Sequence, residues 1–155
     1  GLRVGWLIAP PELLARATMC KQFSDAHTST FAQVTATHYL RAGRMQATLD
    51  QVRNVYAARA RALSQGLRTH LAEALAFTEP KGGLFVWARL TGANGAPTDG
   101  AAFAKQAIAH NVAFVPGAPF FANDPDPSSL RLSFATANEA LIAEGCERLG
   151  KARRS

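Results

Sequence analysis

A long run of regularly spaced apolar residues in the middle of the chain constrains the fold more than any other feature. Between residues 45 and 75, apolar side chains recur every three or four positions, with arginines between them: Leu49, Val52, Tyr56, Ala60, Leu63, Leu67 and Leu71. This spacing is typical of an α-helix that buries one face and exposes the other. We therefore predict one long helix, in which Gly66 costs about 1 kcal/mol relative to alanine and permits a bend.

The regions on either side of this helix differ from each other. Two shorter helical patterns precede it, at residues 12–23 and 30–43, and Thr30 is a candidate N-cap of the second. A short strand is predicted before them, at residues 4–8, because apolar residues alternate there and two prolines follow. After the long helix we expect strands at residues 82–90, 112–115 and 130–134, helices at 99–110 and 138–150, and a loop at 94–97. Strands that alternate with helices indicate the α/β class.

The charge balance is basic, with 17 lysines and arginines against 11 aspartates and glutamates. Such a balance raises the question of a nucleic-acid or other anionic partner. Most arginines are scattered, however, and the only dense run is Lys151, Arg153 and Arg154 at the C-terminus. We expect these three residues to form a solvated, frayed tail, because chain termini usually lie free unless they are docked.

Cysteine usage and hydropathy exclude several other classes. Cys20 and Cys146 lie far apart, without a Cys-x-x-Cys pattern or histidines at ligand spacing, so neither a disulfide framework nor a metal site is indicated. We expect both cysteines to be reduced and buried. No stretch approaches the roughly 20 apolar residues of a membrane span, and no signal peptide is recognisable. We therefore expect a soluble, cytoplasmic protein without a membrane partner.

Five short motifs follow one another along nearly the whole chain. They are Gly1-Leu2-Arg3-Val4-Gly5-Trp6; Lys21-Gln22 with Asp25-Ala26-His27-Thr28-Ser29 and Gln33; Pro80-Lys81-Gly82-Gly83-Leu84-Phe85-Val86-Trp87; Val115-Pro116-Gly117 with Phe120; and Leu130-Arg131-Leu132-Ser133-Phe134-Ala135. In this order they resemble the fold-type-I aminotransferases that use pyridoxal 5'-phosphate (PLP), class I and II. The resemblance is strongest to the branch of the 2-aminoadipate aminotransferases and the MocR-type regulators.

The resemblance implies a domain plan and a reaction. Residues 1–44 would end the large PLP-binding domain, residues 45–75 would form a long connecting helix, and residues 76–155 would form the small C-terminal α/β domain. The protein would move an amino group between an amino acid and a 2-oxo acid as a homodimer, with PLP as the electron sink. The lysine that forms the Schiff base would lie upstream of residue 1, in the N-terminal part of the same enzyme. No catalytic residue is therefore assigned within this chain, and we expect the chain alone to be inactive.

Two arginines are the candidate site residues. The resemblance implies that Arg3 binds the phosphate of PLP, for which a planar, permanently charged guanidinium is suited. It also implies that Arg131 binds the α-carboxylate of the substrate. From the residues alone, the polar face of a half-buried strand, shared with Ser133, is the favoured interpretation of Arg131, although a charge among core residues must find an anion or reach solvent.

Other residues and other functions compete with this interpretation. Gly82 and Gly83 fit either a close approach to a ligand or an ordinary turn. Asp25 and His27 suggest a catalytic dyad, but no nucleophile accompanies them, and we assign them no chemistry. The main alternative function is the aminotransferase-like effector domain of a MocR/GntR-type transcription regulator, which would bind nucleic acid only through a winged-helix domain upstream. A second alternative is an α/β interaction domain unrelated to PLP. The substrate's side chain is not readable from this sequence.

Overall fold

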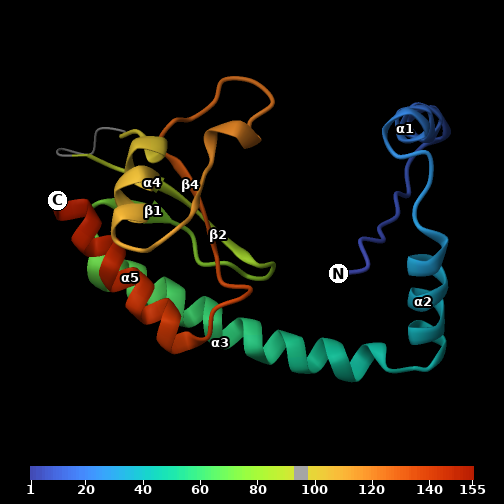
Figure 1. Ribbon diagram of the computed structural model, residues 1–155, viewed down its shortest axis with the longest axis horizontal. Coiled ribbons are helices and arrows are strands. Elements are labelled where there is room, and N and C mark those ends of the chain that lie inside the picture. Colours follow the sequence, from blue (N-terminus) through green and yellow to red (C-terminus); the bar gives the residue numbers. More distant parts are fainter. Residues whose placement is uncertain (93–97) are drawn as a thin grey trace. The chain divides into compact units, whose positions relative to one another are not determined.

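The computed structural model describes residues 1–92 and 98–155, and the loop predicted at residues 94–97 lies outside them. The chain divides into two compact units, Gly1–Gln51 and Val52–Ser155. Figure 1 shows the helices and strands of both units.

The first unit consists of an irregular segment and two helices. Helix α1 (Pro11–Ser24) begins with proline at its first position, where the missing N–H is not needed. Helix α2 (Thr30–Arg41) is capped by the Ser29 side chain, which accepts a hydrogen bond from the backbone N–H of Ala32. The prediction of Thr30 as the cap was wrong by one residue. The helix ends before Gly43, whose φ of +70° suits glycine.

The strand predicted at residues 4–8 was wrong. Residues 1–10 have no regular structure, and Trp6 and Ile8 are 86% and 89% exposed. The physical reason is that a strand needs a hydrogen-bonded neighbour, and no described segment pairs with this one.

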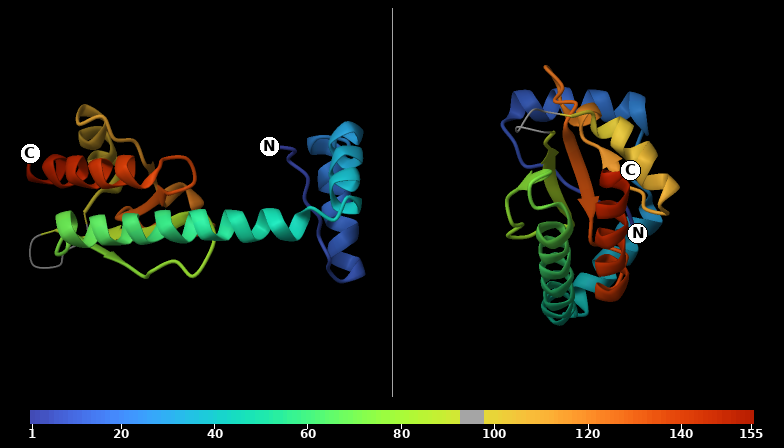
Figure 2. Two further views of the ribbon diagram at one scale, coloured as in Figure 1. Left: turned by 90° about the horizontal axis from the view of Figure 1, so that it is seen from below. Right: turned by 90° about the vertical axis from the view of Figure 1, so that its left-hand side faces the viewer.

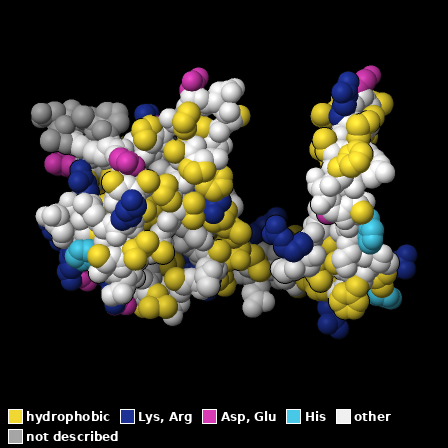
Figure 3. Space-filling view, turned by 45° about the horizontal axis from the view of Figure 1, so that its top comes forward, with side chains coloured by type: hydrophobic (Ala, Val, Ile, Leu, Met, Phe, Trp, Pro, Cys, Tyr) yellow, Lys and Arg dark blue, Asp and Glu magenta, His cyan; other side chains and the backbone are white. Residues whose placement is uncertain are grey.

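Large apolar side chains also remain exposed on α1 and α2, as Figure 3 shows for the face in view. An extended exposed apolar surface of this kind is typical of an interface.

The long helix α3 (Met45–Leu71) confirms the main prediction from the sequence. It runs without interruption through Gly66 and ends four residues before the predicted boundary. Leu75 belongs instead to strand β1 (Leu75–Phe77), after a turn in which the N–H of Ala74 donates to the carbonyl of Leu71. The buried end of the predicted apolar stripe consists of Leu63, Leu67 and Leu71.

The second unit is built on a four-stranded antiparallel sheet with the order β1-β2-β4-β3. Its other strands are β2 (Phe85–Leu90), β3 (Val115–Pro116) and β4 (Ser129–Ser133). Strand β3 is shorter than predicted and starts later, because the N–H of Val112 donates to the carbonyl of Ala107 at the end of a helix. Strand β4 is an inner strand, and Arg131 at its centre lies opposite Trp87 on one side and Val115 on the other.

Three helices cover one face of this sheet: α3, α4 (Gly100–Ala109) and α5 (Glu139–Arg154). Figure 2 shows α3 and α5 running side by side. Helix α4 is capped by Asp99 and α5 by Asn138, as the boundaries predicted from the sequence imply. Alternate residues of β2 and β4 enter the core between the layers, namely Val86, Ala88, Leu90, Leu130 and Leu132, and Phe134 directly after β4 joins them. The predicted α/β class is confirmed.

Two expectations about the surface were wrong. Lys151, Arg153 and Arg154 do not form a frayed tail but belong to α5, because Ala152 between them is fully buried and Arg153 donates to the carbonyl of Thr91 at 3.2 Å. Cys20 is exposed rather than buried, because α1 buries none of its residues. Among the helices that the structure describes, none is both long and apolar enough to cross a membrane.

Gly66 allows α3 and α5 to approach closely. A Cβ built at this position would lie 2.7 Å from Sγ and 2.8 Å from Cβ of Cys146. Burial at this contact raises the pKa of the Cys146 thiol to about 11. The glycine therefore serves the packing of two helices.

Replacing Gly66 by alanine should destabilise the protein. We expect a loss of about 1–3 kcal/mol from overpacking, although alanine favours a helix by about 1 kcal/mol. Gly145→Ala is the matched control, because Gly145 also lies within a helix but has open space around it. That variant should be as stable as the wild type or more so. Urea unfolding of both variants measures the difference, and equal stability of the two would contradict a close contact at Gly66.

The turn that leads into β4 is held by Asp126. Its carboxylate accepts hydrogen bonds from the hydroxyl and the N–H of Ser128, at 2.6 and 3.0 Å, and pairs with Arg89 at 2.8 Å. The Ser128 hydroxyl is the main cause of a pKa below the ordinary value of 3.8; the Ser128 N–H and Arg89 lower it further, while partial burial opposes them. The charged form of Asp126 therefore stabilises this turn.

This stabilisation should depend on pH in a defined direction. Because the pKa of Asp126 is lower in the folded state, its contribution is complete above the unfolded value and is lost as pH falls through the folded value. Asp126→Asn should lower the unfolding free energy at pH 7. The difference in unfolding free energy between the variant and the wild type should narrow below about pH 4. Denaturant unfolding at several pH values tests this. If this difference in unfolding free energy stayed constant down to acidic pH, the charge of Asp126 would have no role in the turn.

Candidate functional site

The face of the sheet opposite the three helices carries the candidate site. Strand side chains alternate, so Phe85 and Trp87 of β2 point away from the core, as does Arg131 of β4. Phe85 and Trp87 are both exposed by about two fifths, at 43% and 41%. We call this side the outer face of the sheet. The short 3₁₀ helix η2 (Ala118–Phe120) covers part of it through Phe120.

Two aromatic rings lie close to Arg131 on the outer face. Its guanidinium carbon is 4.5 Å from the ring centroid of Phe85 and 4.5 Å from that of Phe120. The Nε atom is buried and has no hydrogen-bond partner, and none of the described carboxylates pairs with the side chain. Arg131 is thus a partly buried cation whose charge is not neutralised by any residue that the structure describes.

The ring of Phe120 contacts Trp87 on the outer face. It meets Trp87 edge to face, with centroids 6.1 Å apart, and Phe121 packs on the same indole at 6.0 Å. Gly117 precedes η2, and its N–H donates to the carbonyl of Ser129 at 2.7 Å. A Cβ at Gly117 would collide with the Ser129 hydroxyl and lie 2.8 Å from a ring carbon of Trp87. Only glycine therefore lets the loop lie this close to β4.

This arrangement is suited to binding a carboxylate. A guanidinium offers a planar edge of N–H donors that matches the two oxygens of a carboxylate, and charge-assisted hydrogen bonds of this kind are stronger than neutral ones. A partly buried cation without a partner is costly and needs an anion. The alternative role of Arg131 is to form part of the polar face of strand β4 together with Ser133.

Arg3 belongs to the other unit, so the structure does not place it relative to Arg131. It is exposed, lies in the irregular segment before α1, and makes no contact with an acidic residue among those described. Its φ is +56°, a left-handed conformation that is uncommon for residues other than glycine. Backbone strain of this kind is frequent at ligand-binding sites.

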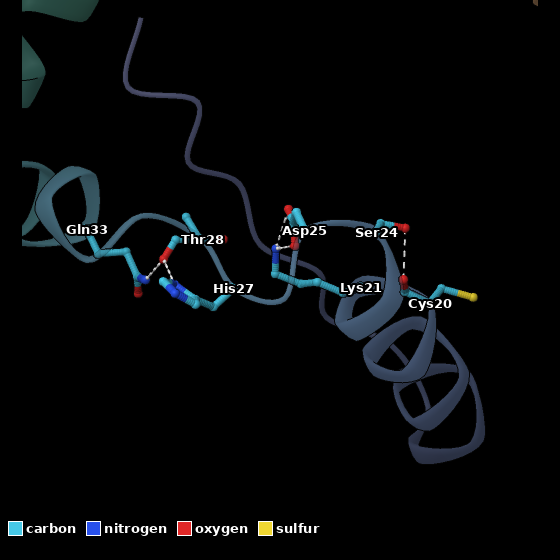
Figure 4. A network of polar contacts seen from close by, with 7 residues as sticks. All are labelled: Cys20, Lys21, Ser24, Asp25, His27, Thr28 and Gln33. Atoms are coloured by element: carbon cyan, nitrogen blue, oxygen red, sulfur yellow. Dashed lines mark hydrogen bonds and ion pairs between the residues drawn. The ribbon is translucent and has the colours of Figure 1, made fainter.

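The polar loop between α1 and α2 does not form a catalytic dyad. Figure 4 shows that the carboxylate of Asp25 faces Lys21, with hydrogen bonds of 2.8 and 2.9 Å, rather than His27. The ring of His27 contacts the carbonyl of Thr28 at 3.0 Å, and Gln33 donates to the same oxygen at 2.8 Å. These contacts stabilise the loop itself. Among the residues that the structure describes, no cluster of His, Cys, Asp or Glu could hold a metal ion.

A separate pocket of about 440 Å³ lies in the second unit between α3 and the glycine pair at residues 82–83. Gly83 has a φ of +78°, which explains why a glycine is needed there. The pocket is lined by Val52, Arg53, Tyr56, Ala57, Ala60, Pro80, Lys81, Gly82, Gly83 and Phe134. Sequence reasoning assigned Val52 and Tyr56 to a buried stripe, and nothing in the sequence indicates that they line a pocket.

Sequence reasoning also missed the two ring partners of Arg131. Strand alternation would have placed Phe85 on the same side as Trp87 and therefore on the outer face. No pattern in the sequence indicates the contact between Phe120 and Arg131, because it depends on how the loop before β4 folds back over the sheet.

The chain is similar to known proteins over nearly its whole length. A model of the family described as aminotransferase class I and II matches residues 1–149. The 2-aminoadipate transaminase of Thermus thermophilus is 41% identical over 98% of this chain and 37% of its own length. The crystal structure of an alpha-aminoadipate aminotransferase from Thermus thermophilus, complexed with N-(5'-phosphopyridoxyl)-L-leucine, is similar with a TM-score of 0.82 at 39% identity. That similarity covers 99% of this chain and 38% of the other.

A relative of another kind is the uncharacterised HTH-type transcriptional regulator YdfD of Bacillus subtilis. It is 32% identical over 90 residues, which are 58% of this chain and 19% of the regulator. The chain spans little more than a third of the length of the transaminase that it matches. The match to the family model extends over almost the whole sequence, from the irregular segment that carries Arg3 to the last turns of α5. The chain therefore belongs to the class I and II aminotransferase family.

Proposed function

We propose that the protein that carries this chain is a PLP-dependent aminotransferase, which moves an amino group between an amino acid and a 2-oxo acid. The observation that carries the proposal is Arg131, a partly buried guanidinium with an unpaired Nε and two rings close to it. Amino acids and 2-oxo acids share one group, the carboxylate next to the reacting carbon. A fixed, unneutralised arginine is the side chain that such a carboxylate requires.

The residues of this chain fit the cofactor as well. Arg3 presents a guanidinium without an acidic partner among the described residues, on a segment held in a strained backbone conformation. We assign to it the phosphate of PLP, because a phosphate and a guanidinium form bidentate hydrogen bonds. When bound, PLP supplies an electron sink for the bond that is broken at the substrate's α-carbon. Arg131 orients the substrate by its carboxylate, which determines the α-bond that is presented for cleavage.

The domain plan and the assembly are part of the same proposal. Residues 1–44 would complete the cofactor-binding domain, residues 45–75 would connect it, and residues 76–155 would form the small domain. The exposed apolar surface of α1, α2 and the segment before them supports burial against further protein, either another part of the same chain or a second copy in a homodimer. We place the protein in the cytoplasm.

Arg131→Ala should weaken substrate binding while leaving the cofactor in place. We expect the variant, in the whole protein, to retain PLP and to lose about 2–5 kcal/mol of binding free energy for amino acids and 2-oxo acids, because the substrate carboxylate is left without its partner. An amine that lacks the carboxylate should bind almost equally well to both proteins. Steady-state kinetics with an amino acid and with its decarboxylated amine measure this contrast.

A melting curve of each protein is the control for this experiment. If Arg131 only forms the polar face of a strand, the alanine variant should lose thermal stability and keep its affinity for amino acids. That outcome would remove Arg131 from the substrate site.

Arg3→Ala should instead weaken the binding of PLP. A charge-assisted contact with phosphate contributes about 1.5–3 kcal/mol, and Arg3→Lys should restore only part of it, since an ammonium lacks the planar fork. The fraction of PLP that is retained after dialysis, read from the visible spectrum, compares the variants. Full retention by the alanine variant would place the phosphate elsewhere.

The similarity to an HTH-type regulator favours a second candidate function. The same fold would then act as the effector domain of a MocR/GntR-type transcription regulator, with a DNA-binding domain outside this chain. The chain region shared with the regulator is shorter than that shared with the transaminase, 58% against 98%, which favours the enzyme. Transaminase activity together with the absence of a helix-turn-helix in the whole protein would decide for the enzyme.

A further inference from the structure

We propose that Phe85 and Phe120 are positioning residues that clamp the guanidinium of Arg131 and leave only its N–H edge for the substrate's carboxylate. The proposal rests on the proposed function of Arg131. We call these two side chains the aromatic clamp. They come from different elements, strand β2 and helix η2, and meet only on the outer face of the sheet.

The geometry of the clamp is symmetric. Both ring centroids lie 4.5 Å from the guanidinium carbon, a distance at which the negative face of a ring attracts a cation. A guanidinium is weakly hydrated on its two faces and strongly hydrogen-bonding along its edge. Rings that cover these two faces would exclude water there without the loss of a hydrogen bond, while the N–H donors of the two terminal nitrogens would remain for a carboxylate.

The clamp takes the place of the acidic partner that a buried charge usually has. A carboxylate beside Arg131 would hold it equally well, but it would neutralise the charge and compete with the substrate. Aromatic rings fix the side chain without neutralising it. Holding Arg131 in one orientation before binding also reduces the loss of side-chain entropy when the substrate arrives.

The surroundings of Phe120 support a dedicated role for its ring. Although Phe120 is 52% exposed, its ring contacts Trp87 edge to face, and Gly117 brings the loop close enough for this contact. Phe85 is fixed differently, by the pairing of its strand with β4 opposite Ser133. A phenylalanine that served only to fill the core would be buried, whereas Phe85 and Phe120 are both exposed on the outer face.

Phe120→Leu tests the clamp in the whole protein, because leucine retains an apolar side chain but has no ring. We expect KM for amino acids to rise about fivefold to tenfold, with kcat changed much less and with KM for the decarboxylated amine unchanged. Binding of propionate, a carboxylate without an amino group, should weaken by a similar factor in calorimetry. Phe120→Tyr should restore both values, since it restores the ring.

Phe121→Leu is the matched control. Phe121 contacts the same indole as Phe120, but its ring is not against Arg131. This variant should therefore leave KM for amino acids and the affinity for propionate near the wild-type values. An equal loss in both leucine variants would overturn the clamp and indicate general damage to the packing around Trp87.

Phe85→Leu provides a second, independent test, including the case in which Phe120→Leu does not fold. It removes the other ring, and we expect the same rise in KM for amino acids without an effect on the amine. If Arg131→Ala weakens amino-acid binding but neither leucine variant does, the clamp is wrong and the proposed function stands. If Arg131→Ala itself leaves amino-acid binding unchanged, the proposed site fails and the clamp fails with it.

Discussion

Strand β4 pairs with a neighbour on each side, and the register of these pairings decides both the core and the candidate site. It pairs with β2 from Ser129 to Ser133 and with β3 at Leu130 and Arg131. Because successive side chains of a strand point to opposite faces, placing Leu130 and Leu132 in the core turns Arg131 to the outer face. A slip by one residue would bury a guanidinium and expose two leucines, so the apolar core strongly favours this register.

Two glycines bring the layers around β4 into close contact. Gly66 lets α3 approach Cys146 of α5 beneath the sheet, and Gly117 lets the loop before η2 approach Ser129 and Trp87 above it. In each case a methyl group would overlap a neighbouring atom. The inner contact contributes to stability, whereas the outer contact sets the position of the Phe120 ring. A site supported by a packed sheet in this way is held more rigidly than one formed by loops alone.

Much of the fold could be predicted because its signals are local. The apolar stripe of α3 follows from residue spacing, and the starts of α4 and α5 follow from Asp99 and Asn138, whose side chains cap them. The predictions that failed depend on distant contacts. Residues 4–8 alternate as a strand does but have no described neighbour to pair with, and the basic C-terminus continues α5 because Ala152 is buried. Cysteine is a residue type that is usually buried, but Cys20 is exposed because it lies on a helix that buries none of its residues.

The same division applies to the candidate site. The sequence by itself determined most of the element types, the α/β class and, through the family resemblance of its motifs, the choice of Arg3 and Arg131, because residue spacing and short motifs are properties of neighbouring positions. Only the tertiary structure decided that Arg131 lies close to Phe85 and Phe120, with its Nε unpaired, since these residues are separated by 46 and 11 positions. Their meeting depends on the strand register and on the loop folding over the sheet, and both result from packing across the whole second unit.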